Sequence, residues 1–197
     1  MTITYDKKLN AARIEGKEGV ALFMYDKIAT PDALLSQSFE GIDMLLVVPE
    51  NYDPFNGDHI LEWARVTEKM LKEKTLLVFS HGEYRIKDLH MKGIKDSGSL
   101  QFVIESPECT VGVLTTKPSE SFVRKYVPLD VIIGPETALA DIQLDFEPFF
   151  VVLTQMTPAY MQQTGVTEIN ETGKVTVKKI DPLARESTID MSVSYLK

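Results

Sequence analysis

Four short apolar runs constrain the fold of this chain more than any other feature, because each one ends abruptly in a polar, turn-forming cluster. The runs are Met44–Val48, Leu76–Phe79, Val111–Leu114 and Val131–Ile133. Continuous apolar runs of this length, rich in branched side chains, are typical of strands that are buried on both faces of a sheet. We therefore predict that all four are strands of one sheet.

The segments between these runs are predicted to be helices that connect parallel strands. The clearest helix spans about residues 57–74, and a second spans residues 118–126. A strand, a helix and the next parallel strand form a right-handed unit in nearly all known sheets. In the first helix, the expected apolar stripe is flanked by Trp63, Val66 and Met70. The stripe itself consists of Ile60, Leu61, Ala64, Thr67 and Leu71.

The remaining segments before residue 157 complete the predicted domain. Residues 1–26 have β character, and a short helix begins at Thr30, which is followed by proline at the first helical position. The alternating segment 84–91 predicts an edge strand, whereas 92–99, with two glycines and two serines, predicts a mobile loop. Together these features predict a three-layer α/β domain with a mostly parallel, Rossmann-like sheet over residues 1–156.

The composition changes after about residue 157. The segment 166–179 predicts a β-hairpin that turns at 170–173, and apolar residues alternate with polar ones over 189–195, as in a half-buried strand. A lone strand of this kind has to pair with another strand. We therefore expect residues 157–197 to be a C-terminal antiparallel β extension, packed either on the same domain or on a partner subunit.

Composition and charge exclude several classes of protein. The chain has 21 basic and 29 acidic residues, for a net charge of −8, which disfavours nucleic acid as a partner. Cys109 is the only cysteine, as in proteins of reducing compartments. The N-terminus lacks the pattern of a signal peptide, and no apolar run approaches the roughly 18 residues of a transmembrane helix. A cytoplasmic protein without a membrane partner is expected.

Polar side chains cluster directly after the predicted strands, where open α/β sheets bind their ligands. Free backbone N–H groups at a helix start favour an anion, although capping of the helix by these same side chains is the favoured explanation and ligand contact the alternative. The chain lacks both the GxxxxGK[ST] and the GxGxxG phosphate-binding patterns, so the sequence leaves the cofactor unknown. The candidate ligand-binding residues are His81, Glu83, Thr115, Thr116, Lys117, Ser119 and Glu136.

A metal centre is not predicted. His81 and Glu83 could share a metal ion with Asp53, but the spacing of the three histidines matches no zinc signature. The acidic loop 50–58 lacks the EF-hand pattern, and turns and a helix cap account for most of its polar residues. Cys109 follows a glutamate that disfavours a thiolate, and no serine lies in a GxSxG elbow.

Two functions remain open on this basis. The first is a site for a small anionic metabolite at the carboxyl edge of the sheet, where the chain either binds or converts its ligand. The second is a non-catalytic accessory or assembly protein, or a homo-oligomer, that acts through its C-terminal β segment. The sequence does not decide whether the protein is an enzyme.

Overall fold

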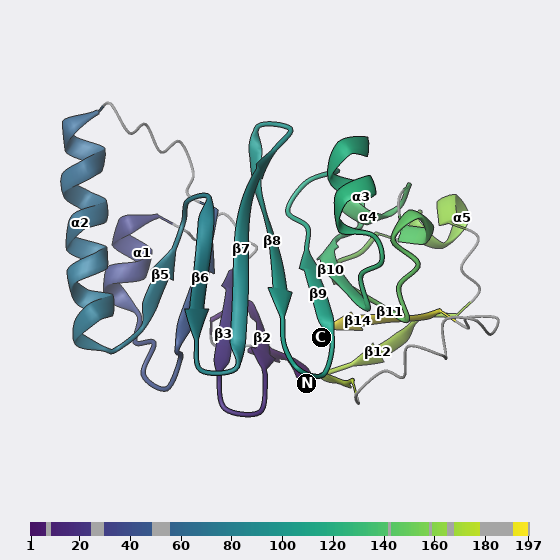
Figure 1. Cartoon of the computed structure of the whole chain (residues 1–197), viewed down its shortest axis with the longest axis horizontal. Helices are drawn as coiled ribbons and strands as arrows, with labels where there is room; N and C mark the ends of the chain where they lie inside the picture. The colour runs from purple at the N-terminus through teal and green to yellow at the C-terminus, as the bar shows by residue number, and fades with distance from the viewer. Residues whose placement is uncertain are drawn as a thin grey trace.

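The chain folds into two mixed β-sheets that pack face to face, with helices on both outer faces (Figure 1). The computed structural model describes residues 1–6, 9–24, 30–48, 56–141, 143–157, 159–164, 168–177 and 191–196, without the side chains of residues 143, 144 and 163. None of the described helices is long and apolar enough to cross a membrane.

The first sheet has six strands in the order β13-β1-β2-β3-β4-β5. Strands β1, β2 and β3 form an antiparallel meander, and β4 and β5 continue it in parallel. The strands are β1 Thr2–Asp6, β2 Ala11–Glu15, β3 Val20–Met24, β4 Met44–Val47, β5 Leu76–Val78 and β13 Lys174–Thr176.

The second sheet has eight strands in the order β12-β14-β11-β10-β9-β8-β7-β6. Strands β6 to β9 are antiparallel to their neighbours, whereas β9, β10, β11, β14 and β12 are parallel. The strands are β6 Gly82–Ile86, β7 Leu89–Asp96, β8 Ser99–Glu105, β9 Thr110–Val113, β10 Val131–Pro135, β11 Phe150–Gln155, β12 Asn170–Thr172 and β14 Ser192–Leu196.

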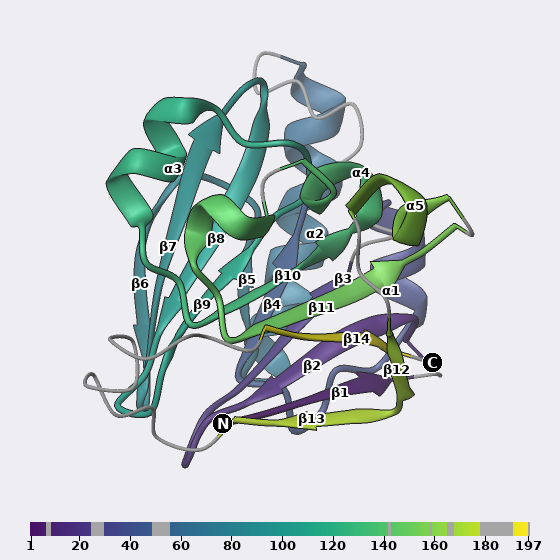
Figure 2. The same ribbon diagram turned by 90° about the vertical axis from the view of Figure 1, so that its right-hand side faces the viewer.

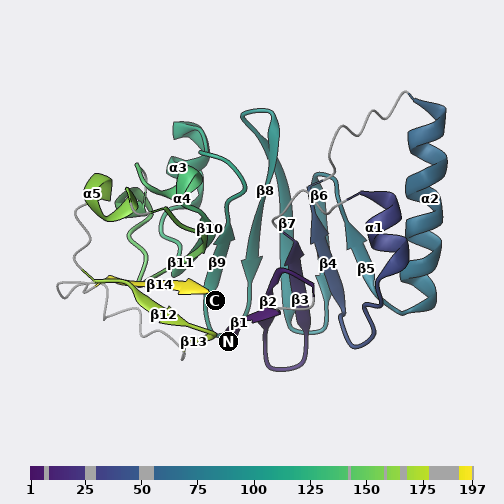
Figure 3. The ribbon, with the colours of Figure 1, turned by 180° about the vertical axis from the view of Figure 1, so that it is seen from behind.

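Helices α1 (Pro31–Ser36) and α2 (Gly57–Lys72) cover the outer face of the six-stranded sheet. The outer face of the other sheet is covered at its far end by four short helices, which lie at the opposite end of the molecule (Figure 3). These are α3 (Glu120–Tyr126), α4 (Glu136–Leu139), the 3-10 helix η1 (Gln143–Phe146) and α5 (Tyr160–Thr164).

The main core lies between the inner faces of the two sheets. Nearly every strand contributes buried side chains to it, and Phe23 of one sheet meets Phe102 of the other edge to face, with ring centroids 6.2 Å apart. Aromatic pairs of this geometry are favourable beyond the area that they bury. The packing of these inner faces therefore holds the two sheets together.

The prediction of one parallel, Rossmann-like sheet is wrong. All four apolar runs are strands, but β4 and β5 belong to one sheet and β9 and β10 to the other. Each of these strands is covered by the opposite sheet on its inner face and by helices on its outer face. Such a strand needs the same continuous apolar run as the central strand of a three-layer fold, so the pattern did not distinguish the two architectures.

The predicted mobile loop over 92–99 and the predicted C-terminal antiparallel segment are also wrong. Strand β7 continues to Asp96, and only Ser97 and Gly98, both with positive φ, form the turn into β8. Strands β12 and β13 are separated by Gly173 alone but join different sheets, so they form no hairpin. Strand β14 lies between β11 and β12 and is parallel to both (Figure 2).

Helix α2 buries a different face from the one predicted. Trp63, Val66 and Met70 are buried against the sheet, and Trp63 stacks on Phe79 with ring centroids 4.9 Å apart. Ile60 and Leu71, from the predicted stripe, are instead 46% and 66% exposed. The helix has two apolar faces, and the one that carries the largest aromatic side chain packs on the sheet.

A carboxylate links the turns at one end of the two sheets. Asp88, between β6 and β7, accepts hydrogen bonds from the backbone N–H groups of Lys17 at 2.6 Å and Gly19 at 2.7 Å, and a longer one from Glu18 at 3.2 Å. Partial burial raises the pKa of Asp88, but these N–H donors outweigh burial and hold the pKa below its usual value. The turn between β2 and β3 is thus tied to the other sheet.

We expect Asp88→Asn to lower the free energy of unfolding by about 1–3 kcal/mol at pH 7, because it removes charge-assisted hydrogen bonds. The folded-state pKa of Asp88 is depressed, so its stabilisation is complete above the unfolded pKa of about 3.9 and is lost as the pH falls through the folded pKa. Urea unfolding at pH 7 and near pH 3 should show a difference that shrinks at low pH. Glu18→Gln, which changes an exposed side chain in the same turn, is the control. Equal stability of Asp88→Asn and the parent chain at pH 7 would show that the hydrogen bonds of Asp88 do not stabilise the fold.

Gly134 lies where β10 passes close to the segment after β9. A Cβ atom at this position would be 2.3 Å from the backbone oxygen of Leu114. We expect Gly134→Ala to destabilise the protein by on the order of 1–3 kcal/mol, because backbone on both sides has to move. Gly57→Ala is the matched control, since its Cβ would meet no atom within 4 Å at the first residue of α2. Equal thermal melts of the two variants would show that β10 can shift freely.

Candidate functional site

The candidate residues that follow β9 hold their own loop in place. The buried side chain of Gln101 accepts a hydrogen bond from the backbone N–H of Thr115 at 2.8 Å and donates to the backbone and side-chain oxygens of Thr116, both at 3.1 Å. The hydroxyl groups of Ser99 and Thr115 lie 2.9 Å apart. The polar groups of this loop are thus partnered within the chain.

The start of α3 already has an anion from the chain itself. Ser119 caps the helix by accepting from the N–H of Phe122, and its own N–H and hydroxyl donate to the carboxylate of Asp96 at 2.7 and 2.5 Å. Anions are favoured at helix starts, and Asp96 occupies that position here. The anionic ligand that the sequence predicted at Ser119 would therefore have to displace the carboxylate of Asp96.

Two further candidate residues are also paired within the chain. Lys117 Nζ donates to the carboxylate of Asp141 at 2.7 Å, and both side chains are more than half exposed. Glu136 accepts from the backbone N–H of Thr157 at 2.5 Å and so joins the start of α4 to the segment that follows β11. Exposed ion pairs contribute little to stability, so Lys117 remains available to an incoming ligand more readily than Ser119.

His81 and Glu83 lie apart from these loops, in a groove beside the edge strand β6. The groove has a volume of about 350 Å³ and is formed by residues of β6 and β7, by His81 before β6 and by the end of α3. We call it the lysine groove. It is lined by His81, Gly82, Glu83, Lys92, Gly93, Ile94, Lys95, Lys125 and Tyr126.

The lysine groove gathers positive charge. Lys92 pairs with Glu105 at 2.5 Å, which raises the pKa of the lysine, although partial burial opposes this effect. Lys125 Nζ lies 5.2 Å from the centre of the Tyr126 ring, within the range of a cation–π contact. Neither Lys95 nor Lys125 forms an ion pair with a carboxylate of the described residues. Their ammonium groups are thus free to meet a negatively charged ligand.

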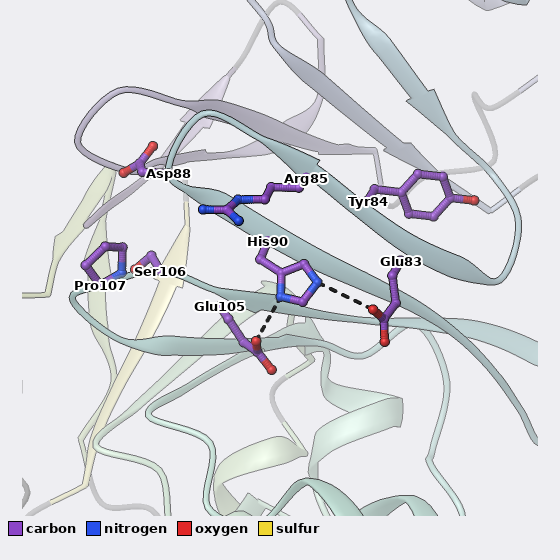
Figure 4. Close-up of a pocket in the computed structure, with 8 residues that line it drawn as sticks. All are labelled: Glu83, Tyr84, Arg85, Asp88, His90, Glu105, Ser106 and Pro107. Atoms are coloured by element: carbon purple, nitrogen blue, oxygen red, sulfur yellow. Dashed lines mark hydrogen bonds and ion pairs between the residues drawn. The ribbon is translucent and has the colours of Figure 1, made fainter.

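A second depression adjoins the lysine groove at Glu83 and extends over the outer face towards the other end of β7 (Figure 4). It has a volume of about 520 Å³, and His90 lies near its centre. His90 Nδ1 is 3.0 Å from Glu105, and Nε2 is 3.8 Å from Glu83. The hydrogen bond from Lys92 lowers the pKa of Glu105, with a smaller contribution from His90 and against the effect of burial.

A histidine oriented by a carboxylate can act as a general base, provided that a nucleophile or a water molecule lies within reach. The hydroxyl of Ser106 donates to the carbonyl of Cys109 and accepts from two backbone N–H groups of its turn. The hydroxyl of Tyr84 is bonded to Ser80. Among the described residues, the His90 depression therefore offers an acid–base pair without a side-chain nucleophile.

The residues that the sequence analysis missed are His90, Lys92, Lys95, Lys125 and Tyr126. The signal for Lys92 was present as opposite charge, because Glu83 lies opposite Lys92 across β6 and β7, whereas His90 lies opposite Arg85 and gives no such signal. Opposite charges at such positions are typical of cross-strand pairs. Assigning 92–99 to a loop concealed this register and with it the groove.

The described residues supply few ligands for a metal ion. Among them, no three His, Cys, Asp or Glu side chains converge in a suitable cluster. Cys109 is buried, and burial raises its pKa to about 11, which disfavours the thiolate that binds metals. Asp53, considered with His81 as a ligand, lies outside the described residues.

Comparison with solved structures shows which fold this is. The chain superimposes over its whole length on a protein from Thermotoga maritima assigned as a Zn-dependent hydrolase of the metallo-beta-lactamase superfamily, with a TM-score of 0.60, 12% identity and 98% of that chain covered. A second match is a protein from Parabacteroides distasonis that is assigned as a metal-dependent hydrolase. The superposition covers 99% of this chain and 93% of that protein, with a TM-score of 0.53 and 9% identity.

The metallo-beta-lactamase fold protein YhfI from Bacillus subtilis matches all of this chain with 96% of its own length, a TM-score of 0.51 and 10% identity. No protein-family model matches the sequence, and no curated protein matches it. At these identities the likeness concerns the fold alone. The two mixed sheets and their outer helices are those of the metallo-beta-lactamase fold.

Proposed function

We propose that this protein binds a small anionic molecule in the lysine groove. The observation that carries the proposal is that three lysines from β7 and α3, Lys92, Lys95 and Lys125, line one groove of a chain whose net charge is −8. Glu83 is the one carboxylate in the lining, and Glu105 pairs with Lys92 at 2.5 Å, so Lys95 and Lys125 carry the excess positive charge. Such a local reversal of charge attracts anions that the rest of the surface repels.

The lining also indicates the shape of the ligand. Ile94 and Tyr126 are half-buried and supply apolar surface beside the ammonium groups of Lys95 and Lys125. A phosphate or carboxylate group would pair with the lysines, and a compact apolar or aromatic part would lie against the tyrosine ring. The ligand class that fits is therefore a small metabolite with at least one negatively charged group.

Conversion of the bound molecule is the second candidate, and the pair formed by His90 and Glu105 favours it. The proteins from Thermotoga maritima and Parabacteroides distasonis are both assigned as metal-dependent hydrolases. A catalytic zinc ion needs three protein ligands and an open position. The described residues of this chain do not fit that requirement, so we derive no step through a metal ion.

The accessory-protein alternative depended on a C-terminal strand that pairs with another chain. Strand β14 already has a partner on each side within its own sheet, β11 and β12. Its backbone donors and acceptors are therefore used within the chain, which supports the ligand-binding function over that alternative.

We expect Lys95→Ala and Lys125→Ala each to weaken anion binding about tenfold or more, because a charge-assisted contact contributes about 1.5–3 kcal/mol. Pyrophosphate and citrate serve as calorimetric probes for the two kinds of anion. Lys17→Ala, an exposed lysine in the turn between β2 and β3, is the control and should leave binding unchanged. Lys117→Ala tests whether the ligand extends to the loop after β9, as the sequence predicted.

Two outcomes would contradict this proposal. Binding that is unaffected in both groove variants would place the anion elsewhere. If neither probe binds at millimolar concentration, and native mass spectrometry detects no copurified small molecule, the groove is a solvated surface.

We expect dialysis against EDTA to leave the melting temperature and anion binding unchanged, because the described residues contain no three-ligand cluster. Elemental analysis of the purified protein before and after dialysis is the matched measurement. A stoichiometric metal whose removal lowers the melting temperature would show that ligands come from the segments outside the described residues.

A further inference from the structure

The surface of α2 carries an apolar stripe that the fold does not use. Ile60, Leu61 and Leu71 are 46%, 63% and 66% exposed, and Ala64 is also exposed. Thr67 lies on the same stripe, and its hydroxyl is satisfied by the carbonyl of Trp63 at 2.8 Å. We call these five residues the α2 stripe. We propose that it is the contact surface of a homodimer, in which α2 packs antiparallel against α2 of a second copy of this chain.

The position of α2 leaves the stripe accessible to a second copy. The helix is the outermost element at one end of the molecule, and the four short helices lie at the other end (Figures 1 and 3). Trp63, Val66 and Met70 pack on the sheet from a separate face of α2. The stripe can therefore be covered without disturbing the core.

The order of side-chain sizes along the stripe suits a two-fold contact. Ile60, Ala64, Thr67 and Leu71 are spaced by four, three and four residues, so they fall in one row on the helix. In an antiparallel pair, Ile60 faces Leu71 of the second copy and Ala64 faces its Thr67. The two large residues lie at the ends and the two small ones at the crossing point, which lets the helices approach closely.

The charges beside the stripe are complementary in the same arrangement. Arg65 and Glu68 lie on the same flank of α2, next to Leu61. Antiparallel pairing about the centre of the stripe brings Arg65 of one copy towards Glu68 of the other, and two-fold symmetry repeats the contact. In the single chain Glu68 pairs with Lys72 at 2.8 Å, and both side chains are about 70% exposed, so the carboxylate can meet a second cation.

A membrane surface fits this helix less well than a second copy. Helices that lie on membranes carry mainly Lys and Arg on their polar face. The polar positions of α2 are mixed in sign, with Asp58, Glu62 and Glu68 beside Arg65, Lys69 and Lys72. Because one helix pair buries less than the roughly 1,200–2,000 Å² of a standard interface, we expect a dimer of about micromolar affinity.

The test is sedimentation velocity of the full chain over a concentration series. We expect a reversible monomer–dimer equilibrium that Leu71→Glu weakens on the order of a hundredfold, since the change occurs twice in a symmetric dimer. Met161→Glu replaces another exposed apolar residue, on α5 at the other end of the molecule and 39% exposed, and should leave the equilibrium unchanged.

Charge reversal tests the orientation of the two helices. Glu68→Arg should weaken the dimer, and the double variant Arg65→Glu/Glu68→Arg should restore it, with circular dichroism to confirm that each variant is folded. The proposal is overturned if the parent chain stays monomeric at every concentration, or if Leu71→Glu leaves the affinity of the dimer unchanged. A monomer that floats with phosphatidylglycerol vesicles through the α2 stripe overturns it in favour of a membrane surface.

Discussion

The fold depends on the apolar layer between the two sheets, because each sheet has an inner face that cannot be exposed to water. Strands from both ends of the chain contribute to this layer, including Ile3 of β1 and Val175 of β13. Burying such side chains stabilises a protein by roughly 1.5–3 kcal/mol each. At Gly173, between β12 and β13, the chain crosses from one sheet to the other, so each of these strands is an edge strand of its own sheet.

The sequence predicted local structure better than it predicted topology. The four apolar strands, the cap of α1 at Thr30 and the cap of α3 at Ser119 follow from side-chain chemistry within a few residues. The partners of the strands depend on contacts between distant segments. A run such as Leu45-Leu46-Val47 does not indicate to which sheet it belongs or what packs on each of its faces. The same limit applies to α2, because only the assembled sheet selects Trp63 over Leu61 for burial.

The candidate site shows the same division between local and distant information. The sequence showed the helix starts and the polar loops. In the structure, several of their polar groups form hydrogen bonds or ion pairs with other residues of the same chain. Asp96, on a strand 23 residues before Ser119, supplies the anion at the start of α3. Nothing local to Ser119 indicates this carboxylate. The lysine groove depends on distant information instead, since Lys95 and Lys125 line the same groove only because β7 and α3 both contribute to it.

The charged outer face of β6 and β7 also has a structural consequence. Strand β6 is an edge strand, and exposed sheet edges invite pairing with other chains unless charges block them. Glu83, Arg85 and their partners Lys92 and His90 place charge along this edge, so association through β6 is disfavoured. The apolar α2 stripe lies on a different element. An association of two copies through α2 would leave the lysine groove, which is formed by β6, β7 and α3, outside the contact. Ligand binding and dimerisation can therefore be disrupted separately, by Lys125→Ala and by Leu71→Glu.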